Sequence, residues 1–308
     1  MRLSLAARAW YESGTHVTVE GKRIYVREVG DAAAPALLLV HGFPSSSYDW
    51  RHVMRLLADA FHCVALDLPG YGLSDKPVAY SYSLFQQADV VEGVVHHCGL
   101  HTAHVLSHDV GTSVHTELLA RQAEGALGFE VLTSTLLNGS ILKKMATLTE
   151  FQRILENPSQ AEQAQALCDA MLPGYASGLR RLMSRPDALS DEDAEVMTEL
   201  LAYHDGHRRV PQVYGYVRER YLLAERWLDA LQRAEGPVQL LWGADDPVAN
   251  VTMGRALAEL LPRARYQEVA GVGHFMPFEA PEVIAAAMRS FVDSASPVHE
   301  GSDERSGL

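Results

Sequence analysis

The stretch "HVLSHDVGTSVHTELL", residues 104–119, contains the turn that decides the fold. An apolar run ends at Ser107, and a helix-forming run begins near Thr112. Between them lies Asp109, followed two residues later by Gly111. The small residues on both sides permit a sharp, strained turn, which lifts one side chain above the edge of a sheet beside a helix N-terminus. Asp109 is then either a reactive carboxylate or an ordinary helix N-cap, and this stretch alone leaves both interpretations open.

Around this turn, short and continuous apolar runs predict a mainly parallel sheet. Such runs suit strands that are buried on both faces, and the amphipathic stretches between most of them indicate helices, as in an α/β fold. An alternating apolar pattern in residues 15–29, broken at Gly21, predicts a β-hairpin before them. Together these segments predict an eight-stranded, mostly parallel sheet flanked by helices. The continuous runs are residues 36–42, 61–70, 102–109, 129–139, 237–246 and 264–274.

Residues 140–234 interrupt the alternation, because no strand pattern occurs there. We predict an all-helical cap domain in this interval, inserted after strand 6, and a core domain formed by residues 1–139 and 235–296. The polar segment 297–308 is expected to be a disordered tail. Because sites form at the carboxyl ends of parallel strands, the cap should roof one. Helical patterns in the cap cover residues 141–156, 160–172, 177–184, 191–204 and 217–232.

The composition disfavours several classes of protein. Lys and Arg number 26 and Asp and Glu 39, so the net charge is −13, which repels nucleic acids and acidic membrane surfaces. The three cysteines lack metal-ligand spacing and fit a reducing cytoplasm. No apolar run approaches the length of a membrane span, and the N-terminus has no continuous apolar signal segment. We expect a cytoplasmic protein without cofactor or metal, and the oligomeric state stays open.

Two later stretches favour the reactive carboxylate. In "LLWGADDPV" (240–248) an acidic pair ends an apolar strand, and in "EVAGVGHFMPFEAPE" (268–282) His274 follows a Gly-x-Gly turn. The chain order of Asp109, an acid and His274 is the nucleophile, acid, histidine order of α/β-hydrolases. These positions fall at the ends of predicted strands, and "HGFP" (41–44) follows another. The combination predicts an active site.

The chain resembles an α/β-hydrolase over nearly its whole length, from about residue 16 to residue 294. The aspartate at the turn, together with "DLPGYGLSDKP" (67–77), is similar to the branch that contains epoxide hydrolases and haloalkane dehalogenases. This resemblance implies that Asp109 is the nucleophile and His274 the general base. A serine esterase is disfavoured, because Ser107 lies two residues before the position of the nucleophile.

The same resemblance implies the remaining groups of the site. The acid is Asp246 rather than Asp245, because the family pattern is Gly-x-x-Asp and Gly243 fixes the count. The backbone N–H groups of Phe43 and Val110 would form the oxyanion hole.

The chemistry of a carboxylate differs from that of a serine. A carboxylate attacks a saturated carbon and becomes an alkyl ester, displacing a halide or opening a strained ring. Water must then release the ester, and His274, oriented by Asp246, can deprotonate that water while two backbone donors stabilise the oxyanion. The resemblance therefore predicts a hydrolase that acts through a covalent intermediate.

The residues around the turn argue against a halide as the leaving group. Haloalkane dehalogenases usually have Trp after the nucleophile and commonly Asn after His-Gly, so that two N–H donors hold the halide. Here Val110 and Phe43 take those places, and neither side chain donates a hydrogen bond. Epoxide hydrolases instead protonate the opening oxygen with cap tyrosines, although Val110 departs from their usual Trp as well. Tyr216 matches the expected place of such a donor, with Tyr175, Tyr203, Tyr214 and Tyr221 as possible second donors.

A third group shares further motifs with this chain. "LSHD-x-G", "ELLAR" and "YVRER…RWLDAL" are similar to the branch that includes the mesoderm-specific transcript proteins and the β-lactone decarboxylases of bacterial olefin synthesis. Their proposed chemistry also begins at a strained oxygen ring. We therefore expect a small apolar or amphipathic substrate with such a ring, with epoxide hydrolysis ahead of β-lactone chemistry and dehalogenation third. A different class, a non-catalytic receptor with a hydrolase fold, is the remaining alternative.

Overall fold

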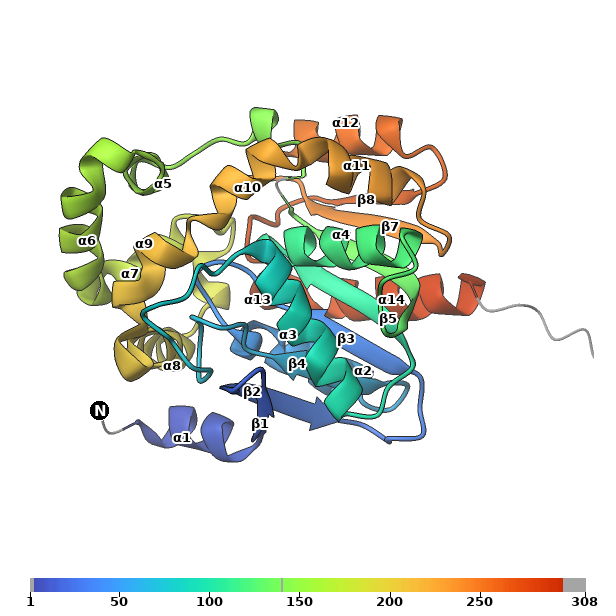
Figure 1. The fold of residues 1–308 in the computed structure, drawn as a ribbon, viewed down its shortest axis with the longest axis horizontal. Coiled ribbons are helices and arrows are strands. Elements are labelled where there is room, and N and C mark those ends of the chain that lie inside the picture. Colours follow the sequence, from blue (N-terminus) through green and yellow to red (C-terminus); the bar gives the residue numbers. More distant parts are fainter. Residues whose placement is uncertain (1–2, 140, 296–308) are drawn as a thin grey trace, which may run out of the picture.

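The computed structural model describes residues 3–139 and 141–295, so the expected tail, residues 297–308, lies outside the described residues. An eight-stranded sheet runs through the described part in the order β1-β2-β4-β3-β5-β6-β7-β8 (Figure 1). β1 and β2 form the expected antiparallel hairpin, β2 pairs antiparallel with β4, and the later pairs are parallel. The strands are β1 (Thr15–Val19), β2 (Lys22–Val29), β3 (Ala36–Val40), β4 (His62–Leu66), β5 (Thr102–His108), β6 (Glu130–Leu137), β7 (Val238–Gly243) and β8 (Arg265–Val269).

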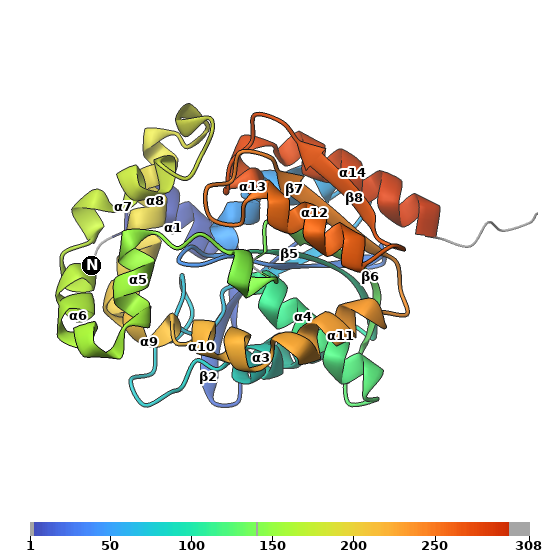
Figure 2. The same ribbon diagram turned by 90° about the horizontal axis from the view of Figure 1, so that it is seen from above.

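Helices cover both faces of the sheet because its strands are apolar on both sides. In β3, Leu37 and Leu39 face one hydrophobic layer and Leu38 and Val40 face the other, as the two-residue period of a strand requires. α2 (Arg51–Leu57) and α14 (Pro281–Ala295) pack in the first layer, and α3 (Leu84–His97), α4 (Val110–Ala123) and α12 (Val251–Leu260) in the second. Figure 2 shows α14 on the opposite side of the sheet from α3 and α4. This arrangement confirms the predicted eight-stranded, mostly parallel sheet flanked by helices.

A helical insertion follows β6, as predicted, and returns to the sheet at β7. In Figure 1 its first helices lie beside the sheet, whereas α11 lies along α4. The boundaries 140–234 proposed for the cap remain a prediction. The helices are η2 (Lys143–Met145), α5 (Glu150–Glu156), η3 (Pro158–Gln160), α6 (Ala161–Asp169), α7 (Leu172–Arg180), η4 (Pro186–Ala188), α8 (Asp191–Ala202), η5 (Tyr203–Arg209), α9 (Val210–Val213), α10 (Tyr216–Leu222) and α11 (Ala224–Gln232).

Three helical patterns in the insertion were wrong in extent. The pattern over 177–184 starts and ends too late, because α7 runs over Leu172–Arg180. The pattern over 141–156 gives a regular α-helix only from Glu150, because Thr149 and Gln152 form a capping box at its start. The pattern over 217–232 is divided at Leu223 into α10 and α11.

The first described helix, α1 (Leu5–Glu12), was not predicted from the sequence. Ser4 caps it, and the Ser4 hydroxyl donates to Glu199 in α8 at 2.8 Å. The Trp10 side chain is buried against the hairpin residue Tyr25. Another helix, α13 (Met276–Glu279), follows the last strand. None of the helices in the described segments has both the length and the apolar character needed to cross a membrane.

Candidate active site

Asp109 occupies a strained turn between β5 and α4. Its φ of 48° and ψ of −114° lie outside the regions that L-residues ordinarily adopt, as at the turn that carries a nucleophile. Gly111 is required next to it, because a Cβ there would come within 2.4 Å of the Val40 carbonyl oxygen. The Asp109 side chain makes no capping hydrogen bond to α4 and instead accepts the Phe43 N–H at 2.7 Å. The geometry therefore does not support a simple helix cap.

Asp246 and His274 meet Asp109 at the carboxyl ends of the strands. The Nδ1 atom of His274 lies 2.7 Å from Oδ2 of Asp246, and its Nε2 atom lies 3.7 Å from Oδ2 of Asp109. All three side chains are buried. The backbone N–H of His274 donates to Leu182 O at 2.8 Å, so the loop after β8 is held by the segment that follows α7. The structure thus brings together the three residues expected from the sequence.

Asp246 is surrounded by hydrogen-bond donors. Its Oδ1 atom accepts the N–H groups of Val248 at 2.7 Å and Ala249 at 3.0 Å, and its Oδ2 atom accepts Asn138 Nδ2 at 2.6 Å besides His274. Burial alone would raise the pKa of Asp246, but the charge and hydrogen bond of His274 and these donors lower it below its usual value. Asp246 is therefore an ionised acceptor behind the imidazole.

The neighbouring acid, Asp245, is placed differently. One of its oxygens accepts the Ser184 hydroxyl at 3.0 Å. Asp246, rather than Asp245, contacts His274, as the count from Gly243 implied.

The surroundings of two buried histidines, His274 and His108, shift their pKa values in opposite directions. Burial lowers the pKa of His274, but the charges of Asp246 and Asp109 more than offset this effect and raise it to about 9. Burial and the neighbouring charge of His274 lower the pKa of His108 to about 4. His108 is therefore neutral at neutral pH, and its Nε2–H donates to the backbone oxygen of His274 at 2.9 Å. His274 therefore carries a proton at neutral pH.

The two residues expected to form the oxyanion hole flank Asp109. The Phe43 N–H already donates to Oδ1 of Asp109. Val110 is the first residue of α4 and is buried, so its N–H belongs to the unpaired first turn of that helix. The role of these two groups toward an oxyanion remains a prediction.

A cavity of about 600 Å³ opens over Asp109 and His274. Most of its lining is apolar and comes from the helical insertion. Thr149, Glu150, Gln152 and Arg181 add polar groups to its wall. The apolar lining includes Phe43, Phe151, Leu167, Met171, Leu179 and Leu182.

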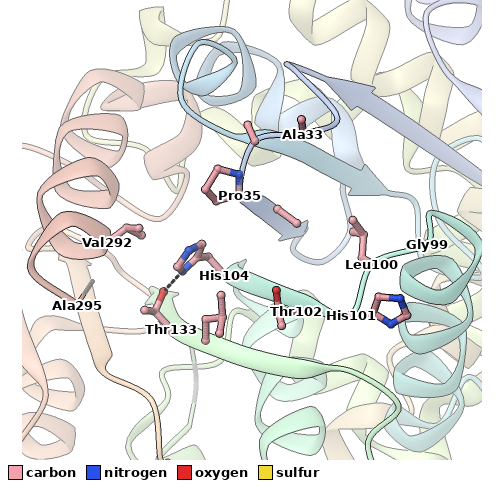
Figure 3. A pocket seen from close by; sticks show the side chains of 13 residues that line it. Ala33, Pro35, Gly99, Leu100, His101, Thr102, His104, Thr133, Val292 and Ala295 are labelled. Atoms are coloured by element: carbon pink, nitrogen blue, oxygen red, sulfur yellow. Dashed lines mark hydrogen bonds between the residues drawn. The ribbon is translucent and has the colours of Figure 1, made fainter. Parts of the chain in front are cut away.

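Another cavity, of about 660 Å³, lies away from these residues (Figure 3). It is lined by the segments that precede β3 and β5 and by the end of α14. His104 lies in its wall, with Nδ1 2.9 Å from the Thr133 hydroxyl. Asp109, Asp246 and His274 do not line it, so the smaller cavity is the candidate active site.

Tyr216, the expected proton donor, is buried at the start of α10. Its ring centre lies 6.0 Å from that of Phe43 and 5.7 Å from that of Tyr214. Burial, followed by the negative charge of Asp109, raises the pKa of Tyr216 well above its usual value. The Tyr214 hydroxyl is buried without a hydrogen-bond partner among the described residues. Tyr216 packs against Phe43 and does not line the cavity over Asp109.

The other tyrosines differ in their relation to the site. Tyr175 lines the cavity, and its hydroxyl donates to Pro44 O at 3.0 Å. Tyr203 stacks on His204, with ring centres 4.0 Å apart, and Tyr221 is 49% exposed.

Sequence reasoning missed Tyr71, although "DLPGYGLSDKP" was recognised as a motif. Burial and then the charge of Asp109 raise the pKa of Tyr71 well above its usual value. Its ring centre lies 6.5 Å from that of Phe43. The position of Tyr71 just after a predicted strand was a signal that could have identified it, since site residues gather at strand ends.

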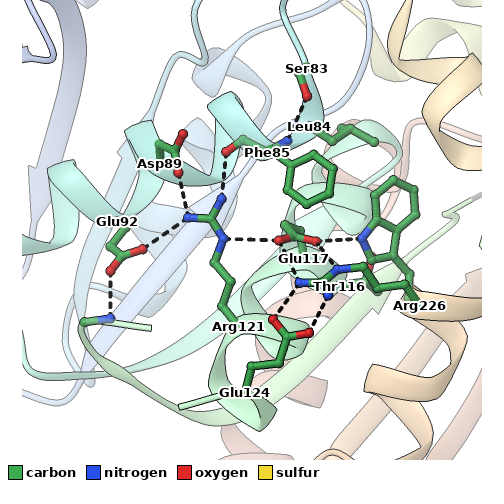
Figure 4. A network of polar contacts seen from close by, with 12 residues as sticks. Ser83, Leu84, Phe85, Asp89, Glu92, Thr116, Glu117, Arg121, Glu124 and Arg226 are labelled. Carbon is green, nitrogen blue, oxygen red and sulfur yellow. Dashed lines mark hydrogen bonds and ion pairs between the residues drawn. The ribbon is translucent and has the colours of Figure 1, made fainter. Parts of the chain in front are cut away.

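Glu117 fixes the end of the insertion to the core. This buried carboxylate in α4 accepts Trp227 Nε1 at 2.9 Å and Arg226 Nε at 2.9 Å, both from α11, and Arg121 Nε at 3.2 Å (Figure 4). The motifs "ELLAR" and "RWLDAL" therefore meet in one network. Because α10 directly precedes α11, the network also restrains the helix that carries Tyr216.

Within residues 3–139 and 141–295, no group of three or more His, Cys, Asp or Glu side chains is arranged to hold a metal ion.

Comparison with known proteins places this geometry in a family. A family model described as alpha/beta hydrolase fold matches residues 35–281. The chain is 38% identical over 290 residues to a protein named "Putative hydrolase LipZ" from Mycobacterium tuberculosis, covering 94% of this chain and 99% of that protein. It is 30% identical over 301 residues to the mesoderm-specific transcript homolog protein of Bos taurus, covering 95% and 90% of the two chains.

A solved structure and more distant relatives agree with these matches. The crystal structure of Cfl2 from Burkholderia cenocepacia matches with a TM-score of 0.78 and 26% identity, covering 90% of this chain and 95% of that one. Other relatives are named epoxide hydrolase and haloalkane dehalogenase. The resemblances to α/β-hydrolases, to the mesoderm-specific transcript proteins, to epoxide hydrolases and to haloalkane dehalogenases are thereby confirmed. Since the family model covers most of the sequence, the chain belongs to the α/β-hydrolase fold family.

Proposed function

We propose that this protein is a hydrolase in which Asp109 opens a strained C–O bond, as in an epoxide, through a covalent alkyl ester. The observation that carries this proposal is the carboxylate of Asp109 on a strained turn, next to a donor N–H and 3.7 Å from His274. A carboxylate in this position suits attack on saturated carbon. The similarity to proteins named epoxide hydrolase supports the same reaction.

In the first step, an oxygen of Asp109 attacks a ring carbon and the C–O bond of the ring breaks. The departing oxygen takes a proton from the Tyr216 hydroxyl, which is protonated beforehand because its pKa is raised. Because Tyr216 packs against Phe43 outside the cavity lining, this step requires its hydroxyl to turn toward Asp109. The imidazolium of His274 then returns a proton to Tyr216. This leaves a neutral ester on Asp109 and a neutral imidazole.

The loss of charge on Asp109 prepares the second step. The negative charge of Asp109 helps to raise the pKa of His274, so forming the ester lowers it again and favours the basic form. His274 can then deprotonate the water that attacks the ester carbonyl. The N–H groups of Phe43 and Val110 stabilise the oxyanion. When the ester C–O bond breaks, the leaving alkoxide takes the proton held by His274 and departs as the diol. The new carboxyl group of Asp109 then gives its proton to the imidazole, which restores the original charges of both groups.

The surroundings of Asp109 support ring opening over the alternatives. A departing halide needs no proton, whereas the buried tyrosine hydroxyls suit a departing oxygen. The motifs "LSHD-x-G", "ELLAR" and "YVRER…RWLDAL", which resemble the branch with the β-lactone decarboxylases, keep a β-lactone as the second candidate substrate. A receptor without catalysis is disfavoured, because three donors besides His274 hold Asp246 behind the imidazole and a receptor needs no such acid.

A trapping experiment tests the nucleophile. His274→Gln is expected to block ester hydrolysis, so the peptide containing Asp109 should gain the mass of an epoxide substrate. Asp109→Asn should show neither adduct nor turnover, because an amide is a poor nucleophile. Parallel incubations with β-lactones and haloalkanes identify the substrate class by product mass.

Isotope labelling gives the complementary result. One turnover of the wild type in heavy-oxygen water should place the label in the carboxylate of Asp109, because water attacks the ester carbonyl. Label found only in the product, with no adduct on the His274→Gln variant, would exclude Asp109 as the nucleophile.

A further inference from the structure

Asp49, in η1 (Ser47–Trp50), is a buried carboxyl that the proposed steps do not use. Its side chain is fully buried. Its Oδ2 atom is hydrogen-bonded to the Ser45 hydroxyl, and its Oδ1 atom has no hydrogen-bond partner among the described residues. An ionised carboxylate in such a place is unfavourable, because one oxygen loses the solvation it had in water. The surroundings of Asp49 therefore favour the neutral acid.

The contacts of Ser45 point to the same protonation state. The Ser45 hydroxyl also lies 3.0 Å from the backbone oxygen of Gly42, which can only accept a hydrogen bond. A hydroxyl has one proton to donate. If Ser45 donates to Gly42, the hydrogen bond between Ser45 and Asp49 needs a proton from Asp49. Both contacts form together only when Asp49 is protonated.

The Gly42 carbonyl belongs to the same peptide group as the Phe43 N–H. That N–H donates to Oδ1 of Asp109 at 2.7 Å. The carbonyl also accepts the Ser45 N–H at 3.2 Å and lies 2.8 Å from Nδ1 of His41. Hydrogen bonds accepted by a carbonyl polarise its peptide group and strengthen the opposite N–H as a donor. They also fix the direction in which that N–H points.

We infer that protonated Asp49 is a positioning residue for the oxyanion hole, acting through Ser45 and the Gly42 carbonyl on the Phe43 N–H. This inference rests on the proposed function, because the oxyanion arises in hydrolysis of the ester on Asp109. When Asp49 loses its proton, the Ser45 hydroxyl turns to the carboxylate and leaves the Gly42 oxygen. Ester hydrolysis then slows, while formation of the ester is affected less.

The charges around Asp49 place this change near neutral pH. Full burial raises the pKa of Asp49 to about 7, although the Ser45 hydrogen bond and the Arg51 charge lower it. Among the smaller contributions to this value, the negative charge of Asp67 raises the pKa and the positive charge of His274 lowers it. From the insertion, Tyr175 in α7 interacts with the carboxyl of Asp49. Tyr175 is neutral, because burial raises its pKa well above the usual value.

Arg51 also pairs with the insertion. Its guanidinium lies 2.6 Å from Asp193 in α8, so its positive charge is shared between that carboxylate and Asp49.

Single-turnover hydrolysis of the Asp109 ester tests the relay. Asp49→Leu should slow hydrolysis by about three- to thirtyfold, consistent with weakening rather than loss of one donor. Asp49→Asn should rescue it, because its amide N–H donates to Ser45 and does not titrate. The rate ratio of Asp49→Asn to wild type should therefore rise about five- to tenfold between about pH 6 and about pH 9, and taking the ratio removes the pH dependence that both enzymes share.

Two further variants show whether the effect of Asp49 passes through Ser45. Ser45→Ala removes the relay without changing the carboxyl, so it should slow hydrolysis and abolish the benefit of Asp49→Asn. Asp245→Asn removes a carboxyl that contacts Ser184 and lies outside the relay, so the ratio of its rate to that of the wild type should stay flat with pH. A flat ratio for Asp49→Asn as well would overturn the inference.

Infrared difference spectra between the wild type and Asp49→Asn measure the protonation state of the Asp49 carboxyl without any turnover of substrate. The wild type should show the carbonyl band of a protonated carboxyl at about pH 6 and lose it as the pH rises through about 7. No such band would refute the inference whatever the reaction. If the band and its titration are found but the His274→Gln variant carries no adduct, the proposed nucleophile fails and Asp49 remains a protonated carboxyl without that reaction.

Discussion

The Nε2 atom of His274 lies 3.7 Å from Oδ2 of Asp109, beyond hydrogen-bond distance, although both side chains are buried. The imidazole is held instead by Asp246, at 2.7 Å from Nδ1. Asp109 therefore keeps an oxygen free of the histidine while its charge still raises the pKa of His274. The two groups are coupled through charge, and chemistry at one should be measurable at the other.

The first prediction uses this coupling. Asp109→Asn removes the charge but keeps the shape of the side chain, so it imitates the neutral ester and should lower the pKa of His274 from about 9. Imidazole NMR titration measures the change. Asp245→Asn, whose carboxyl faces Ser184, is the matched control and should leave the titration of His274 in place. An identical His274 titration in Asp109→Asn and wild type would contradict the second step proposed above.

Tyr216→Phe tests the proton donor. The substitution keeps the packing of the ring against Phe43 and removes the hydroxyl, so formation of the ester should slow by about ten- to several-hundredfold while ester hydrolysis is nearly unchanged. Rapid-quench mass spectrometry of the Asp109 peptide measures both steps. Tyr221→Phe, at a half-exposed position, is the control. A normal rate of ester formation in Tyr216→Phe would move the role to Tyr214 or Tyr71.

Glu117→Gln tests the network between α4 and α11. The buried carboxylate compensates Arg121 and Arg226 and accepts the indole N–H of Trp227, so neutralising it should destabilise the protein by about 3–5 kcal/mol. Glu124→Gln, which changes an exposed partner of Arg226, should lower stability by less than about 1 kcal/mol. Urea unfolding measures both. Equal effects of the two substitutions would show that the network is not a buried anchor.

The sheet could be predicted well from the sequence, because a strand that is buried on both faces needs a continuous run of apolar residues, which is visible within the sequence itself. The continuous apolar run at 36–42 became β3, and the alternating run at 15–29 became the hairpin. Asp109 and His274 could also be found, since strand ends and small residues mark their turns. These features depend on neighbours in the sequence.

Structural features that depend on contacts between residues far apart in the chain could not be predicted from the sequence. The helix α1 is stabilised by contacts to α8, more than a hundred residues away, such as Ser4 with Glu199. The buried state of Asp49 depends on the layers that close over it, and in the sequence it looks like an ordinary polar residue. Tyr71 lay in a recognised motif, but its relation to Asp109 required the fold.

Asp246→Asn should separate the two chemical steps. Every group around the Asp246 carboxylate is a donor: two backbone N–H groups at Oδ1, and Asn138 and His274 at Oδ2. An amide has one oxygen and one NH₂ group, so with its oxygen held by the backbone it presents N–H toward His274. The imidazole Nδ1 must then accept a hydrogen bond, which puts the proton on Nε2, the nitrogen that should take a proton from water. This wrong tautomer is expected to slow ester hydrolysis by about 10³–10⁴-fold.

The attack by Asp109 needs no base, so ester formation in Asp246→Asn should be slowed far less than hydrolysis. The Asp109 adduct should therefore accumulate in this variant as it does in His274→Gln, and intact-mass spectrometry after mixing with an epoxide measures it. Asp245→Asn is again the matched control, because its carboxyl contacts Ser184 and not the imidazole. Fast hydrolysis in Asp246→Asn would show that His274 keeps its basic nitrogen without this carboxylate, and the acid would have to be assigned elsewhere. Loss of adduct formation itself would instead mean that Asp246 supports the attack by Asp109, and the division between the two steps would be wrong.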